Sequence, residues 1–257
     1  MAETRAADDD NSPPPESSTD GSSGRRKKGK RRLVFLFLLL GLVAGFWFGK
    51  REYDKRRFQA EQAARSALTE RDFLVIAEPG SKFVTSVNFR GREVDDASLR
   101  ETAKLYHLIS LSLAKTNIAD RQLALIGRLP ALASLDLSGT AVGDAGLVHL
   151  ESLRTLEALH LANTSISDAG LPHAARLPNL AILDLSATRL TDEGLTALLE
   201  LENLRWLLLA ETGIPDEGLK RLAAMKGLRR LTLIGTKATL GGANQLKAAV
   251  PGLSIDL

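Results

Sequence analysis

Three ionisable side chains recur at a spacing of 24 residues and are the best candidates for chemistry in this chain: Asp136, His160 and Asp184. A histidine between two carboxylates favours its charged form, and the three groups together could hold a divalent cation weakly. Ser138 and Ser186 lie close to them in the sequence. The set is therefore a candidate for a weak metal or catalytic site.

The competing interpretation is a solvated polar row in which His160 balances the two aspartates. We favour this row because the surrounding residues are mostly Ser and Ala, which offer no evident pocket. The sequence also contains no nucleophile-elbow motif and no metalloprotease motif. We accordingly expect no catalytic residue, no resident metal ion and no cofactor.

A second set of aspartates recurs at the same spacing, with one member in each unit: Asp96, Asp120, Asp144, Asp168, Asp192 and Asp216. No second acidic ligand recurs beside them, so a row of metal sites is not indicated. Each aspartate stands where a short helix would begin. We expect the carboxylates to cap these helices by accepting backbone N–H bonds from the first turn.

These acids belong to a unit of 24 residues whose first apolar position recurs without insertion: Val84, Leu108, Leu132, Leu156, Leu180, Leu204 and Leu228. A fixed period of about 20 to 50 residues marks stacked repeats. Within one unit, Leu135 and Leu137 alternate with polar residues, which predicts a strand with one buried face. Leu147, Leu150 and Leu153 follow at a spacing of three, which suits a short helix.

The units resemble leucine-rich repeats, in particular the bacterial kind with Thr-x-Ile/Val-x-Asp-x-Gly-Leu in the second half. The motif is clearest at residues 140–147 (TAVGDAGL), 164–171 (TSISDAGL), 188–195 (TRLTDEGL) and 212–219 (TGIPDEGL). The resemblance implies an α/β fold, a right-handed curved solenoid with parallel strands on its concave face and short helices on its convex face. It also implies interaction and scaffolding rather than a reaction. We expect the repeated threonines to bond the backbone of the turn after each strand.

Binding would use the outward side chains of the concave face, which form columns because neighbouring strands lie about 4.8 Å apart. Two of these columns change from Ser and Asp to apolar residues toward the C-terminus. Exposed apolar groups with aromatic and arginine side chains are typical of protein-binding sites. The predicted protein-binding residues are Ile182, Trp206, Leu208, Arg230 and Ile234, flanked by Arg205 and Arg229.

The N-terminal region has a different composition. Residues 1–32 are rich in Ser, Pro and Gly, end in RRKKGKRR and predict a disordered tail. Residues 33–49 are 17 residues without a charge and would span roughly 25 Å as a helix, so we expect a transmembrane helix acting as an uncleaved signal anchor. A cleaved signal peptide and a buried core helix remain as less favoured alternatives. Residues 25–32 carry more cations than residues 50–57, which favours a cytoplasmic N-terminus and an extracytoplasmic repeat domain.

Residues 50–71 are rich in helix formers and predict a helical stalk, with a solvated spacer favoured over a weak dimer contact. The repeat domain then covers residues 72–257. It opens with two strands around Pro79-Gly80, the first of which would cap the edge of the solenoid. It closes with a strand over residues 254–257, in which Ile255 and Leu257 would face the core.

Charge and motif content reduce the number of function classes that fit the chain. Residues 81–257 carry 19 Lys and Arg against 19 Asp and Glu, which argues against a nucleic-acid-binding face. The chain has no cysteine, so disulfides and thiolate chemistry are excluded. We expect a non-catalytic protein-binding module or scaffold, displayed at a membrane through residues 33–49. An alternative is a substrate-recognition adaptor of the ubiquitin-ligase or effector type, but only residues 50–80 are free to hold its docking module.

Overall fold

The computed structural model describes residues 49–77 and 79–257. The predicted tail, and all of the predicted membrane segment except Gly49, lie outside the described residues. The chain divides into two units, Met1–Lys55 and Arg56–Leu257; residues 49–55 of the first are helical. Among the residues described, no helix combines the length and the apolar character needed to cross a membrane.

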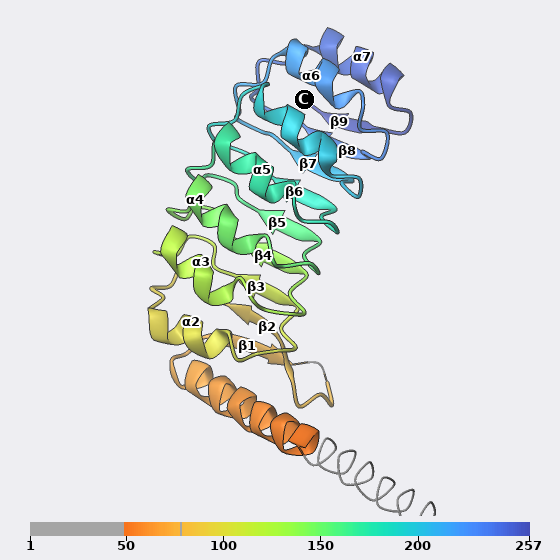
Figure 1. Ribbon diagram of the computed structural model, residues 1–257. Coiled ribbons are helices and arrows are strands. Elements are labelled where there is room, and N and C mark those ends of the chain that lie inside the picture. Colours follow the sequence, from red (N-terminus) through yellow and green to blue (C-terminus); the bar gives the residue numbers. More distant parts are fainter. Residues whose placement is uncertain (1–48, 78) are drawn as a thin grey trace, which may run out of the picture. The chain divides into compact units, whose positions relative to one another are not determined.

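Within the described part of the second unit, nine strands form one sheet in chain order. The first two strands pair antiparallel, and each later strand pairs parallel to its predecessor. Figure 1 shows the strands stacked along one side of the unit and the helices along the other. The strands are β1 (Leu74–Ala77), β2 (Val84–Asn88), β3 (Ser110–Ser112), β4 (Ser134–Asp136), β5 (Ala158–His160), β6 (Ile182–Asp184), β7 (Trp206–Leu208), β8 (Arg230–Thr232) and β9 (Ser254–Asp256).

The helical side differs from repeat to repeat. Some repeats carry an α-helix of seven residues or more, whereas others contain short 3₁₀ segments. The predicted helix after Asp144 is divided in this way into an α-helical turn and a 3₁₀ turn. The elements are α2 (Asp96–Thr102), α3 (Asp120–Ile126), α4 (Asp144–Leu147), η1 (Val148–Leu150), η2 (Asp168–Gly170), α5 (Leu171–Ala174), η3 (Gly194–Glu200), α6 (Asp216–Leu222) and α7 (Leu240–Ala249).

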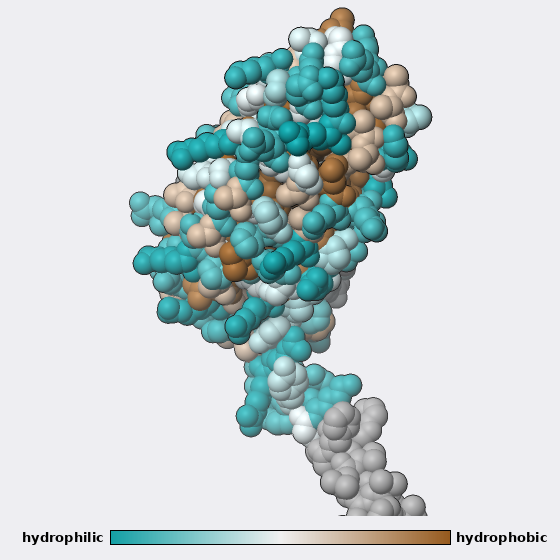
Figure 2. Space-filling view, turned by 45° about the horizontal axis from the view of Figure 1, so that its top comes forward, coloured by the Kyte–Doolittle hydropathy of each residue, from teal (hydrophilic) through white to brown (hydrophobic). Residues whose placement is uncertain are grey.

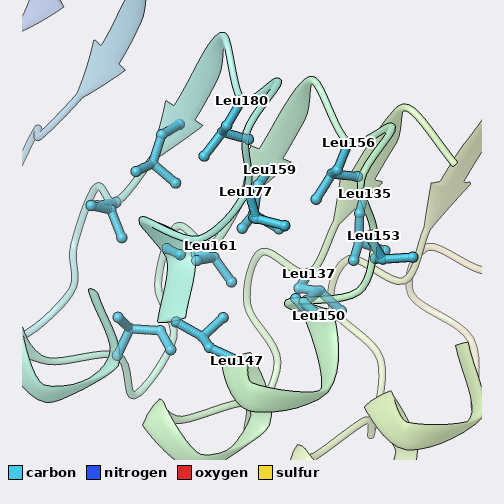
Figure 3. Packing of buried hydrophobic residues seen from close by; sticks show 14 of the residues in the cluster. Leu135, Leu137, Leu147, Leu150, Leu153, Leu156, Leu159, Leu161, Leu177 and Leu180 are labelled. Atoms are coloured by element: carbon cyan, nitrogen blue, oxygen red, sulfur yellow. The ribbon is translucent and has the colours of Figure 1, made fainter. Parts of the chain in front are cut away.

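Leucines from the strand and from the helical side of each repeat fill the space between them. Leu135 and Leu137 are fully buried, and Leu147, Leu150 and Leu153 are almost fully buried. Figure 3 shows these leucines grouped between strand and helical side, with Leu159, Leu161 and Leu177 of the following repeat in the same layer. Each fully buried leucine contributes about 1.5–3 kcal/mol relative to an exposed one. One repeat alone could not bury both of its faces, so the stack is the stable unit.

The turn after each strand has a repeated geometry. A threonine hydroxyl donates to the carbonyl oxygen three residues earlier at 2.6–2.7 Å, which confirms the predicted threonine row. The residue before each threonine, and the equivalent residue of the first repeat, has a left-handed backbone. These residues are Gly91, Lys115, Gly139, Asn163, Ala187, Glu211 and Gly235.

The helix over residues 49–70 differs from a solvated spacer in its C-terminal part. Ala64 and Leu68 are fully buried in the same apolar cluster as the repeat leucines. The carboxylate of Glu61 is also buried; it accepts the Val84 N–H at 3.3 Å and contacts His107 Nδ1 at 3.0 Å. The preference for a solvated spacer was therefore wrong for this part of the helix, which packs on the first repeat.

The two ends of the sheet differ. At the N-terminal end, β1 and β2 form the hairpin expected around Pro79-Gly80. At the C-terminal end, Ile255 is half-buried against the core, but Leu257 is half exposed. The prediction that Leu257 faces the core was wrong, because β9 is the last strand of the sheet and no neighbouring strand among the described residues covers that side.

Candidate binding face

The outward side chains of β1–β9 form the concave face, and the strand register brings the predicted candidates together. Asp136 pairs with His160, and His160 pairs with Asp184, on three successive strands. Trp206 is the register partner of Ile182, and Leu208 is the partner of Asp184. The polar row and the apolar residues are therefore direct neighbours on one surface.

The polar row consists of ion pairs and backbone contacts. His160 Nδ1 lies 3.9 Å from Asp184 Oδ2, and Arg90 Nη1 lies 3.7 Å from Asp136 Oδ2. The backbone N–H of Ser138 donates to Asp136 Oδ1, and that of Ser186 donates to Asp184 Oδ1, each at 3.0 Å. Both serines thus orient a carboxylate through the backbone, which is a structural task.

The electrostatic environment of His160 and Asp184 favours the charged form of each side chain. The carboxylate of Asp184 raises the pKa of His160 and Asp136 adds to this, whereas burial opposes the rise. Burial alone would raise the pKa of Asp184, but the interactions with His160 and Ser186 outweigh it and the pKa is lowered. A raised pKa favours the protonated imidazole, and a protonated ring nitrogen cannot act as a general base.

The same geometry bears on the weak metal candidate, Asp136, His160 and Asp184. Each carboxylate already has a backbone donor and a basic side chain as neighbour. Across residues 49–77 and 79–257, no group of three or more His, Asp or Glu side chains is arranged to hold a metal ion. The arrangement can balance charge and accept hydrogen bonds from a partner.

The repeated aspartates do not cap their own helices as predicted. Asp144 is the first residue of α4, and the residue before it makes no side-chain cap. Its carboxylate instead accepts the backbone N–H and the hydroxyl of Ser167 in the next repeat, at 2.8 and 2.6 Å. Asp168 and Asp216 bind Thr191 and Thr239 in the same way. These aspartates therefore join neighbouring repeats.

The C-terminal apolar group (Ile182, Trp206, Leu208 and Ile234) is accessible on β6–β8 and the turn after β8. Trp206 is 45% exposed and Ile234 is 54% exposed, while Ile182 and Leu208 are half-buried. Arg230 borders the group, and its Nε and Nη2 both donate to Asp256 Oδ2 at 3.1 Å. Arg230 thus lies beside the apolar group as part of an exposed ion pair with Asp256.

One pair of residues on the concave face was not anticipated. Leu74 and Ile76, here called the N-terminal apolar pair, are 57% and 47% exposed on β1. Their register partners, Asn88 and Ser86, belong to the outward columns of the concave face. The alternation in LVIA (74–77) was a signal for this pair, but assigning it to the outward face required the antiparallel register.

The exposed apolar residues occupy small parts of the surface. On the surface that Figure 2 shows, hydrophilic side chains predominate and apolar ones form small separate groups. Single exposed apolar residues are normal on soluble domains, whereas adjacent ones indicate a contact surface.

Comparison with known proteins agrees with this architecture. Three consecutive segments match the family model for leucine-rich repeats, at residues 130–150, 152–171 and 176–199. The fold is a leucine-rich-repeat solenoid. No curated protein matches the chain by sequence.

Two internalins from Listeria monocytogenes str. 4b F2365 resemble the solenoid. Internalin InlF aligns with a TM-score of 0.52 and 20% identity, over 66% of this chain and 52% of its own length. This chain thus spans about half of that internalin. Internalin C2 (inlC2) aligns with a TM-score of 0.47 and 20% identity, over 67% of this chain and 80% of its own length. At this identity the likeness to InlF concerns the fold alone.

Proposed function

We propose that this chain is a non-catalytic protein-binding module that contacts its partner through the concave face. The observation that carries the proposal is Trp206. It is a large aromatic side chain, nearly half exposed, in register beside Ile182 and next to half-buried Leu208. A few residues supply most of the binding free energy in protein interfaces, and tryptophan is enriched among them.

The polar part of the face supports the same proposal. Half-exposed Ser, Asp and His side chains around an apolar centre can form the polar rim of an interface. Arg230, held by Asp256, adds a fixed donor beside the apolar group. The predicted contact residues are therefore Ile182, Trp206, Leu208, Arg230 and Ile234.

We further propose display at a membrane, with residues 33–49 as a single membrane-spanning helix, a cytoplasmic N-terminus and an extracytoplasmic solenoid. The support is the sequence: 17 residues without a charge, preceded by seven Lys and Arg within residues 25–32. Protease treatment of intact cells that produce a C-terminally tagged chain tests this. Loss of the tag from outside supports the orientation, and protection until lysis contradicts it.

The binding proposal is tested by site-specific photo-cross-linking in cells. A benzoylphenylalanine in place of Trp206 should give a discrete protein adduct. The matched control replaces Val148, which is 46% exposed on η1 and lies on the helical side. Equal adducts from both positions, or none from position 206, would contradict binding through this surface.

A further inference from the structure

The concave face has a second apolar region at the opposite end from Trp206. Leu74 and Ile76 of the N-terminal apolar pair continue two outward columns onto β1. Both side chains are about half exposed, and β1 is the first strand at the edge of the sheet. Edge strands are usually protected by charged residues or proline, and LVIA contains neither.

The entry to β1 is held in place by ion pairs. Arg71 Nη1 lies 2.8 Å from both carboxylate oxygens of Asp95, and Arg92 Nη2 lies 3.1 Å from Asp72 Oδ2. Asp72 itself has a left-handed backbone, with φ of 61°. The backbone of β1 thus begins at a turn held by two ion pairs, so placing Leu74 and Ile76 against a partner requires little backbone ordering.

The floor between the two apolar regions consists of small and polar side chains. From β2 to β5 the first outward column reads Ser86, Ser110, Ser134 and Ala158. From β1 to β7 there are six strand intervals, which correspond to about 29 Å at roughly 4.8 Å each. The concave face is therefore a low polar floor between apolar residues at each end.

The charges on this face compensate one another. Its three outward columns carry three basic residues, one of them His160, and three acidic residues over the described strands and turns. They pair as Arg90 with Asp136, His160 with Asp184, and Arg230 with Asp256. A highly charged partner would find little net opposite charge along this floor, so complementarity favours an uncharged polar surface on the partner.

The apolar residues also have lateral breadth. Trp206, Leu208 and Ile234 occupy three adjacent outward columns, which span roughly 13 Å along the strands. A single extended strand would be too narrow to cover all three columns. An α-helix with its side chains is about 10–12 Å wide, and about 19 residues of helix span 29 Å.

We infer that the concave face receives one partner helix of about 20 residues, lying across the strands, with apolar side chains at both ends and uncharged polar side chains between. The N-terminal apolar pair contacts one end and the C-terminal apolar group contacts the other. This inference rests on the proposed function and adds to it the shape and the chemistry of the partner.

The test uses a phage-displayed library of 20-residue helical peptides, selected on the purified full chain. The affinity of the selected peptides is then measured for the wild type, for the double variant Leu74→Ser/Ile76→Ser and for Trp206→Ser. Each variant should weaken binding about tenfold or more, because each removes one apolar contact. Val148→Ser removes an exposed apolar residue from the helical side and should change affinity less than twofold.

The outcomes separate the two proposals. If binding depends on Trp206 but not on Leu74 and Ile76, the two-ended helix is wrong while concave binding stands. If binding depends on neither, the proposed function falls as well. Self-association of the wild type that Leu74→Ser/Ile76→Ser abolishes would make a second copy the occupant and overturn the inference. All of these variants should melt within a few degrees of the wild type, because the altered side chains are about half exposed.

Discussion

At the scale of residues, the polar row shows how spacing alone can suggest chemistry that the environment then restricts. The period of 24 places Asp136, His160 and Asp184 side by side, as the sequence indicates. The sequence does not reveal that each carboxylate is held by a backbone N–H two residues later. Those bonds occupy one oxygen of each carboxylate and leave fewer lone pairs for a metal ion or a substrate, and they depend on the turn after each strand.

The charge of His160 gives a stability prediction with a defined sign. Its pKa is raised in the folded chain, chiefly by Asp184. The stabilisation is therefore fully present below the unfolded value of about 6.5 and is lost as pH rises through the higher folded value. Urea unfolding of the wild type and of His160→Gln across this window should show the wild type losing its advantage with increasing pH.

A matched variant assigns this pH effect. Asp184→Asn removes the principal cause of the raised pKa while keeping the size of the side chain. The pH dependence across the window should then shrink toward that of His160→Gln. An unchanged slope in Asp184→Asn would show that another group is responsible.

At the scale of elements, the turn after each strand has one position with a left-handed backbone, and different residue types occupy it. Seven equivalent positions have a left-handed backbone, and only three of them are glycine. Lys115, Ala187 and Glu211 adopt it against their intrinsic preference, which costs about 1–2 kcal/mol for residues with a Cβ. The three glycines at the equivalent positions were the available signal.

Ala187→Gly should therefore stabilise the solenoid by about 0.5–1 kcal/mol, because relief of the left-handed strain exceeds the entropy that glycine adds to the unfolded chain. Ala162→Gly is the control, since Ala162 lies in the preceding repeat, outside the left-handed positions. It should destabilise by a similar amount. Chemical denaturation of the two variants measures both effects, and destabilisation by Ala187→Gly would refute the strain argument.

The repeated aspartates are a second case in which the sequence pattern did not predict the hydrogen-bond partner. One aspartate per repeat at the start of a helix predicts a cap, yet the carboxylate binds the residue 23 positions later. Ser167, Thr191 and Thr239 at those positions were a readable signal for this bridge. Pro215 stands at the equivalent position after Asp192 and has no N–H, so Asp192 instead pairs with Arg221 Nη2 at 3.3 Å.

At the scale of the whole molecule, the period predicts the stack because each repeat has the same two requirements for burial. It does not predict how the stack begins. The helix over residues 49–70 has few apolar residues, and the partners of its buried Ala64, Leu68 and Glu61 lie at long range in sequence. Such contacts are set by tertiary packing rather than by local pattern. The sequence of that segment, taken alone, therefore predicted a spacer.

Stacking also predicts how damage spreads, because each repeat is stabilised by its immediate neighbours. Leu159 is fully buried in β5 between two repeats, whereas Leu253 lies just before the last strand of the sheet. Leu159→Ala should cost about 2–5 kcal/mol and raise amide hydrogen exchange in the repeats on both sides. Leu253→Ala should cost less and raise exchange only in the last repeat and its one neighbour. Equal exchange along the whole solenoid in both variants would instead indicate a single cooperative unit, in which position along the stack does not matter.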